Sequence, residues 1–138
     1  MAFTIYPFIV SSNTEKQNKV LMNHENIHLK QQKELLIILF YPLYFLNSFY
    51  LLIRYLSLKK CYSLNMFEVE SYSYENDLSY LESRKKFTCF KNTKEIVEYK
   101  NNILKEKTNF SEKAMAIFSL SIIMFFLFII IKELKYII

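Results

Sequence analysis

The stretch from Leu35 to Ile53 contains 19 residues and no charged side chain, which is just long enough to cross a bilayer as a helix. Pro42 and the polar pair Asn47 and Ser48 interrupt it, so the tract can also form two half-length pieces. A hairpin that bends near Asn47 and Ser48 has helical arms of ~18 Å, enough to dip into one leaflet. Whether the tract crosses or returns decides which of the flanking residues can meet.

The only two histidines of the chain precede this tract, four residues apart, with a glutamate directly after the first. On a helix, residues four apart lie on one face, a turn from each other. The imidazoles of His24 and His28 can therefore bind one Zn²⁺ from the same side. Glu25 beside them can take a proton from metal-bound water. The spacing predicts a zinc site with His24 and His28 as ligands and Glu25 as the general base.

A catalytic zinc needs a third protein ligand, and without a third histidine this ligand must be a carboxylate or a cysteine. Glu68 and Glu70 are the best candidates, in a predicted helix over residues 65–86. Periodicity does not choose between them, because both flank the same apolar stripe. Asn65 and Glu68 also have capping-box spacing, which would give Glu68 a purely structural role. Cys61 is a further alternative, because a thiolate binds zinc as well.

The two ends of the chain predict different elements. Residues 3–10 are aromatic and β-branched and predict one strand, which Pro7 confines to a sheet edge or splits. Residues 12–15 have capping-box spacing and predict the start of the histidine helix. Residues 114–131 are the clearest transmembrane segment, with lysines at both ends. The basic segment 87–113 precedes it.

Composition excludes several functions. The chain has no glycine, which excludes a P-loop and a GxGxxG dinucleotide site. A net charge of +5 is compatible with nucleic acid, but a membrane protein with cytoplasmic lysines explains it better, so we expect no nucleic-acid partner. Cys61 and Cys89 lack CxxC spacing and predict reduced thiols on the cytoplasmic side.

The HExxH run at 24–28, followed by Glu68-x-x-Ser71-Tyr72, resembles the gluzincin metallopeptidases, whose second helix reads Glu-x-x-Ser/Ala-Asp. An apolar tract between the two motifs is similar to the integral-membrane gluzincins, such as the CAAX and HtpX-like peptidases and the BlaR-type sensors. The runs His-Glu-x-x-His-Leu-x-Gln-Gln and Phe-Glu-x-Glu-x-Tyr-x-x-Glu resemble small uncharacterised HExxH membrane proteins of bacteria more closely.

This resemblance covers residues 1–85 and implies that Glu68 completes the zinc site with the two histidines. It also implies that Glu25 is the general base. Tyr72 departs from the pattern, because many relatives have an aspartate there that orients a zinc-bound histidine. Glu75 or Asp77 can supply that contact in this chain.

Topology limits these interpretations most. The histidines precede the apolar tract and Glu68 follows it, so a single crossing would separate the ligands by ~30 Å. Zinc–ligand bonds are ~2 Å long. A shared metal therefore requires the tract to return to the side it came from. The basic residues before and after the tract then lie together on the cytoplasmic side.

The sequence thus predicts a mainly α-helical protein. A minimal gluzincin-like core with a short N-terminal strand spans residues 1–86 and includes a membrane-dipping hairpin over 35–58. The basic segment 87–113 and the transmembrane helix 114–131 complete it. We expect a membrane-bound Zn²⁺-dependent peptidase of the bacterial inner membrane, facing the cytoplasm and acting on a peptide or protein substrate. The alternative is a non-catalytic membrane scaffold or partner protein with a structural or vestigial zinc site. The sequence predicts neither the oligomeric state nor which of eleven tyrosines stabilises an oxyanion.

Overall fold

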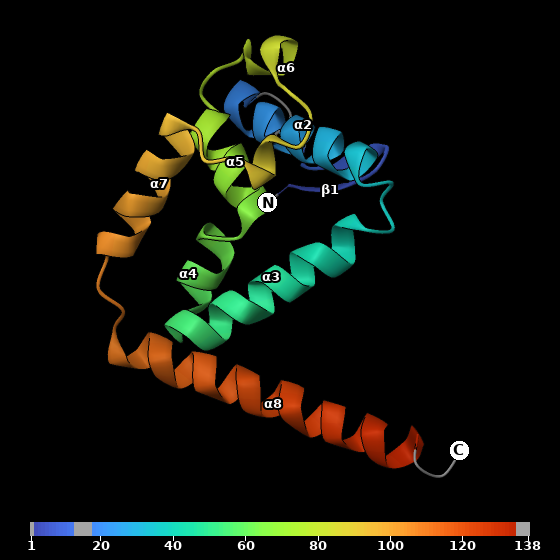
Figure 1. Cartoon of the computed structure of the whole chain (residues 1–138), viewed down its shortest axis with the longest axis vertical. Helices are drawn as coiled ribbons and strands as arrows, with labels where there is room; N and C mark the ends of the chain where they lie inside the picture. The colour runs from blue at the N-terminus through green and yellow to red at the C-terminus, as the bar shows by residue number, and fades with distance from the viewer. Residues whose placement is uncertain (1, 13–17, 135–138) are drawn as a thin grey trace.

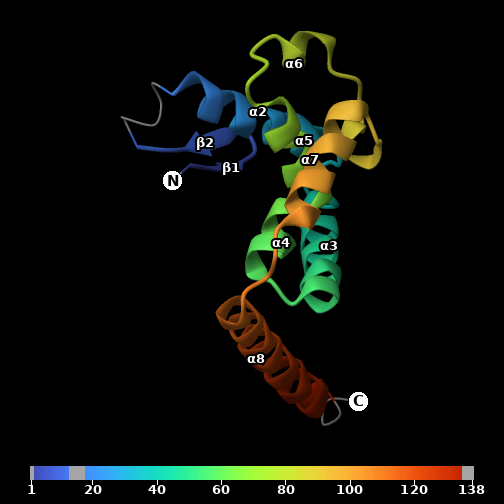
Figure 2. The ribbon, with the colours of Figure 1, turned by 90° about the vertical axis from the view of Figure 1, so that its left-hand side faces the viewer.

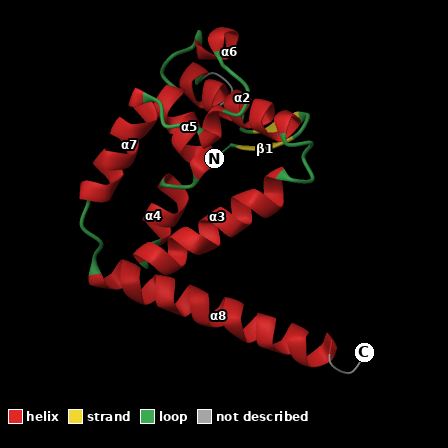
Figure 3. Ribbon diagram, viewed as in Figure 1, coloured by secondary structure: helices red, strands yellow, loops and turns green. Residues whose placement is uncertain are grey.

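The computed structural model describes residues 2–12 and 18–134. This part of the chain is mainly helical, with one small sheet (Figures 1 and 3). The elements follow in the order β1 (Phe3–Ile5), β2 (Phe8–Val10), α2 (Lys19–Glu34), α3 (Phe40–Tyr55), α4 (Leu58–Ser63), α5 (Met66–Tyr74), α6 (Tyr80–Ser83), the 3-10 helix η1 (Thr88–Phe90), α7 (Lys94–Lys105) and α8 (Phe110–Leu134).

Helix α5 is the centre of the fold. It packs between α2 and α7, while α3 and α4 extend from it and meet the first turns of α8 (Figures 1 and 2). A small apolar core lies where these parts join, made of Leu35, Phe40, Phe67 and Cys89. Phe40 of this core also lines the cavity at the candidate site, so the core lies directly beside that site.

The N-terminal segment is a hairpin of two strands instead of one strand. Tyr6 and Pro7 form the turn, and β1 pairs antiparallel with β2. Gln32 of α2 attaches the hairpin to the helix, because its side chain donates to the Thr4 carbonyl (3.0 Å) and accepts from the Tyr6 amide (2.7 Å). The predicted capping box at 12–15 lies mostly outside the described residues. Within them, Asn18 caps α2 through the amides of its first turn.

The predicted bend near Asn47 and Ser48 is wrong, because α3 runs unbroken through both residues. Pro42 lies in the first turn of α3, where a missing amide proton costs no helical hydrogen bond. Asn47 and Ser48 serve a different purpose. They accept hydrogen bonds from the Met66 amide (2.9 Å) and the Asn65 side chain (2.7 Å), and so hold the start of α5 against α3.

The chain reverses at the two ends of α3. Leu36 and Ile37 have positive φ between α2 and α3, and Leu56 has φ 46° where α3 ends and the chain turns into α4. The hairpin is therefore formed by α3 and the short helix α4. It returns the chain to α2, so α5 lies beside the histidine helix and His24, His28 and Glu68 lie close together.

The predicted helix over 65–86 is interrupted. Helix α5 ends at Tyr74, and only the short helix α6 follows before residue 84. The Asn23 side chain explains the ending, because its amide lies 2.9–3.2 Å from the carbonyls of Tyr74, Glu75 and Asp77. A partner on α2 thus satisfies carbonyls that a continuing helix would bind itself.

Helix α8 contains the predicted segment 114–131 and extends beyond it at both ends. Among the described residues it is the one helix long and apolar enough to cross a membrane, with a mean hydropathy of 2.9 over its most apolar window. Most of its large side chains are exposed, including Phe118 and Phe128. Such a surface is suited to lipid and not to water.

Candidate metal centre

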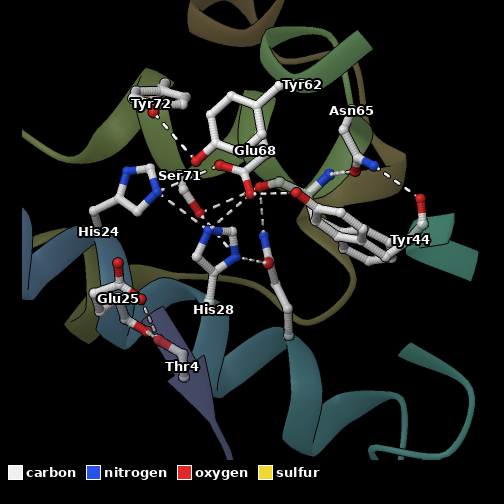
Figure 4. A network of polar contacts seen from close by, with 12 residues as sticks. Thr4, His24, Glu25, His28, Tyr44, Tyr62, Asn65, Glu68, Ser71 and Tyr72 are labelled. Atoms are coloured by element: carbon white, nitrogen blue, oxygen red, sulfur yellow. Dashed lines mark hydrogen bonds and ion pairs between the residues drawn. The ribbon is translucent and has the colours of Figure 1, made fainter. Parts of the chain in front are cut away.

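Three side chains from two helices converge in the interior of the protein. His24 and His28 lie one turn apart on α2, and Glu68 reaches them from the first turn of α5 (Figure 4). The two Nε2 atoms are 3.2 Å apart, and each is 3.5 Å from an oxygen of Glu68. Around tetrahedral Zn²⁺ with bonds of ~2.0–2.1 Å, neighbouring donors lie ~3.3 Å apart. The two imidazole nitrogens have this spacing, and a different oxygen of Glu68 lies near each, Oε2 near His24 and Oε1 near His28, so the three side chains could hold one metal ion.

The charges and burial at this point favour a cation. All three side chains are buried, and Glu68 Oε2 has no hydrogen-bond partner among the described residues. Burial raises the pKa of Glu68, but contacts with His24 and His28 outweigh it and leave the pKa well below its usual range. Burial lowers the pKa of His28, because it disfavours the charged imidazolium. The neighbouring Glu68 carboxylate outweighs this effect, so the pKa of His28 is raised. A buried carboxylate and two imidazole lone pairs pointing at one another are suited to a cation.

The outer nitrogens of both imidazoles are held by acceptors. His24 Nδ1 lies 3.0 Å from Glu75 Oε2, and His28 Nδ1 lies 2.8 Å from Gln31 Oε1. An acceptor at Nδ1 places the proton there and leaves the Nε2 lone pair facing the metal position. Of the two candidates, Glu75 therefore makes the contact with His24, while Asp77 accepts from Ser79 instead.

Gln31 is a site residue that sequence reasoning missed. Its amide nitrogen donates to the Phe67 carbonyl (3.0 Å) and to Glu70 (2.9 Å), so its oxygen must face His28. The signal was present, because Gln31 follows His28 by three residues and shares its helix face.

The structure places the alternative ligands elsewhere. Glu70 accepts from Arg84 Nε (2.6 Å), from the Tyr80 hydroxyl (2.8 Å) and from the Gln31 amide (2.9 Å), and it does not belong to the group of metal donors. Cys61 directs its thiol to the Ser48 carbonyl at 3.1 Å. The capping interpretation explains Asn65, which accepts from the Phe67 amide, but not Glu68.

Glu25 lies beside the three donors without joining them. Together with His28 and Glu68 it lines a cavity of about 370 Å³. The Thr4 hydroxyl of β1 donates to the Glu25 carboxylate and holds it in place (Figure 4). A carboxylate in this position is close to any water or substrate that enters the cavity toward the metal position.

Three tyrosines surround the donors and differ in what their hydroxyls do. Tyr44 donates to Glu68 Oε1 at 2.8 Å and thereby positions that carboxylate. Tyr72 packs its ring edge-on against His24, with centroids 4.6 Å apart. Tyr62 lines the cavity, and its hydroxyl lies 3.4 Å from that of Tyr72. Tyr62 therefore combines a place on the cavity wall with a hydroxyl close to both Tyr72 and the Glu68 carboxylate.

Comparison with protein-family models, with curated proteins and with solved structures gives no match for this chain. The resemblance to gluzincins therefore rests on the motif residues alone. What the structure adds is the arrangement of those residues: a buried group of two histidines and one glutamate that could hold a metal ion.

Proposed function

We propose that this chain is a membrane-bound zinc-dependent peptidase. The observation that supports it most is the convergence of two imidazole nitrogens 3.2 Å apart with the carboxylate of Glu68, and Glu25 lines the same cavity. Two imidazoles and a carboxylate form a donor set that zinc accepts in hydrolases. Among the described residues only His24, His28 and Glu68 form such a group. A structural zinc site uses four protein ligands, whereas three leave a position for water or substrate.

Zinc bound there would polarise the substrate carbonyl and acidify a water molecule. The residues of the chain supply the remaining work. Glu25 takes the proton from the attacking water and passes it to the leaving amine, while Thr4 holds the carboxylate in one orientation. The Tyr62 hydroxyl donates to the oxygen on which negative charge develops. Burial, together with the neighbouring Glu68 charge, raises the pKa of Tyr62, so this hydroxyl stays protonated and able to donate.

Helix α8 supports the membrane part of the proposal, by its length and apolar composition. We place the metal centre on the cytoplasmic side of a bacterial inner membrane, since lysines and arginines are frequent before α8. The alternative of a non-catalytic scaffold would explain the buried ligands equally well. It would not explain why Glu25 and Tyr62 face the same cavity.

Metal analysis combined with digestion of a peptide library tests the proposal. The purified full chain should contain one zinc, which His24→Ala should remove. Glu25→Gln should retain zinc, because the residue is not a ligand, but should abolish cleavage, because an amide cannot accept the proton of water. Glu98→Gln, on the exposed side of α7, is the matched control and should change neither property. Zinc retained in His24→Ala, or full cleavage by Glu25→Gln, contradicts the proposal.

A further inference from the structure

One face of α3 connects the metal cavity with a second, apolar cavity. Tyr41, Phe45 and Phe49 follow one another at intervals of four residues and so lie along one side of the helix. Tyr41 lines the metal cavity, whereas Phe45 and Phe49 line a cavity of about 380 Å³ between α3 and α8. A chain lying along this face would pass from one cavity into the other.

The second cavity, which we call the α3–α8 cleft, is lined by apolar side chains only. Helix α3 contributes Phe45, Leu46 and Phe49, and α8 contributes Ile122, Ile123, Phe126, Leu127 and Ile130. The two helices meet near the start of α8 and diverge from there (Figure 1). One wall of the cleft is the helix that is long and apolar enough to cross a membrane, so an apolar segment in the cleft would lie beside that helix.

A second group of exposed apolar residues points the same way. Leu36, Ile38 and Leu39, between α2 and α3, are 73%, 80% and 54% exposed. This connection and the β1 hairpin lie on the same side of the molecule as the far half of α8, at the right of Figure 1. Apolar residues exposed together are characteristic of a surface that meets lipid or a partner. This connection directly precedes Phe40 and Tyr41, which line the metal cavity, so exposed apolar residues adjoin that cavity as well.

We propose that the substrate is a membrane-anchored polypeptide whose apolar segment occupies the α3–α8 cleft. Its adjoining residues then follow the face of Tyr41, Phe45 and Phe49 to the metal centre. A polypeptide fits better than a lipid, because the metal cavity is walled on one side by the extended residues Ala2, Phe3 and Thr4. An extended chain can lie along such a strand. The route to the metal rests on the proposed peptidase function; occupation of the cleft does not.

Photo-crosslinking tests occupation of the cleft without requiring turnover. The full-length Glu25→Gln protein, in lipid nanodiscs, would carry p-benzoylphenylalanine in place of Phe45 or Leu46, which are 64% and 63% exposed. The matched control carries it in place of Phe128 of α8, which is 66% exposed and does not line the cleft. The probe is a synthetic single-span peptide with about 20 apolar residues and a polar flank on each side.

Both cleft positions should give roughly tenfold more protein–peptide product than the Phe128 position, a preference that random collision in the bilayer does not produce. Equal yields at all three positions, or products with lipid alone at Phe45 and Leu46, overturn the proposal. The same labelling in the His24→Ala background separates it from the peptidase function. Cleft labelling that persists in this background shows that docking does not depend on the metal. Cleavage of soluble peptides without cleft labelling would support the peptidase function but contradict the proposal of a membrane-anchored substrate.

Discussion

Replacing Arg84 by methionine should destabilise the protein strongly, because this side chain neutralises two carboxylates inside the fold. The Arg84 side chain is 3% exposed and that of Glu70 is fully buried. Arg84 contacts both oxygens of Glu70, through Nε at 2.6 Å and Nη2 at 3.2 Å. It also binds Glu34, whose side chain is 11% exposed. Methionine fills a similar volume but leaves these charges without a cation.

The magnitude follows from which contacts remain. Breaking a buried ion pair from one side costs about 3–5 kcal/mol, since the other charge stays buried and unpaired. Glu70 would keep its hydrogen bonds from Tyr80 and Gln31, and Glu34 would keep that from the Phe87 amide. These contacts soften the loss, so we expect about 3–4 kcal/mol for Arg84→Met. Out of the 5–15 kcal/mol that is usual for a folded domain, this is a large share.

A double-mutant cycle shows whether the charge is the cause. Glu70→Gln removes the unpaired charge but keeps an oxygen for Tyr80, so the double variant should be at least about 1 kcal/mol more stable than Arg84→Met alone. Urea unfolding of the full chain in detergent, followed by circular dichroism, measures each free energy. Arg54→Met, at an exposed arginine of α3, is the control and should change stability by less than about 0.5 kcal/mol. A loss below about 1 kcal/mol for Arg84→Met, or no recovery in the double variant, would refute the reasoning.

Three further predictions concern the metal centre and the membrane. Glu68→Gln should weaken zinc binding by more than about 100-fold, and Glu70→Gln by less than that, when both are titrated against a zinc chelator; the reverse order would transfer the ligand role to Glu70. In EDTA, the pKa of His28 is higher in the folded protein than in the unfolded chain, where it is 6.5. Protonation of His28 therefore stabilises the folded protein fully below pH 6.5, and this stabilisation is lost as pH rises through the folded-state pKa. Tm should therefore fall as pH rises above 6.5 without zinc, and this fall should be absent at saturating zinc. Single cysteines at the exposed positions Lys19 and Asn92, in a variant without the native cysteines, should label from the same side of the membrane; labelling from opposite sides would contradict the returning hairpin.

Local helix geometry was enough to predict the histidine pair, but not to choose the third ligand. His24 and His28 meet because residues four apart on any helix do so. Glu68 and Glu70 are two residues apart, so they project about 200° from each other around α5. Which one faces the histidines depends on how α5 is rotated. Arg84 settles that rotation by binding Glu70, and its position follows a loop that no periodicity describes.

The misplaced bend has a different cause. Sequence rules find helix ends by glycine or asparagine at positive φ, and this chain contains no glycine. Leucine, isoleucine and phenylalanine take those positions instead, at Leu36, Ile37, Leu56 and Phe87. Such residues cost roughly 1–2 kcal/mol each in the left-handed region and give no turn signal. Asn47 and Ser48 suggested a bend because polar residues in an apolar tract have no evident local partner. Their hydrogen-bond partners lie at the start of α5, far away in the sequence.

The buried contact between α2 and α5 is largely polar, and this gives the proposed metal a second role. Asn23, His24, His28 and Gln31 on α2 face Glu68, Glu70 and Ser71 on α5, all buried. Few apolar side chains of these helices, chiefly Ile27 and Phe67, are fully buried. Buried polar groups add stability only when each one is hydrogen-bonded or paired with a charge, and Glu68 Oε2 has no hydrogen-bond partner within the described chain. Zinc would supply that partner and join the two helices, so its binding free energy would appear as folding free energy. Catalysis and the packing of α2 on α5 would then depend on the same ion.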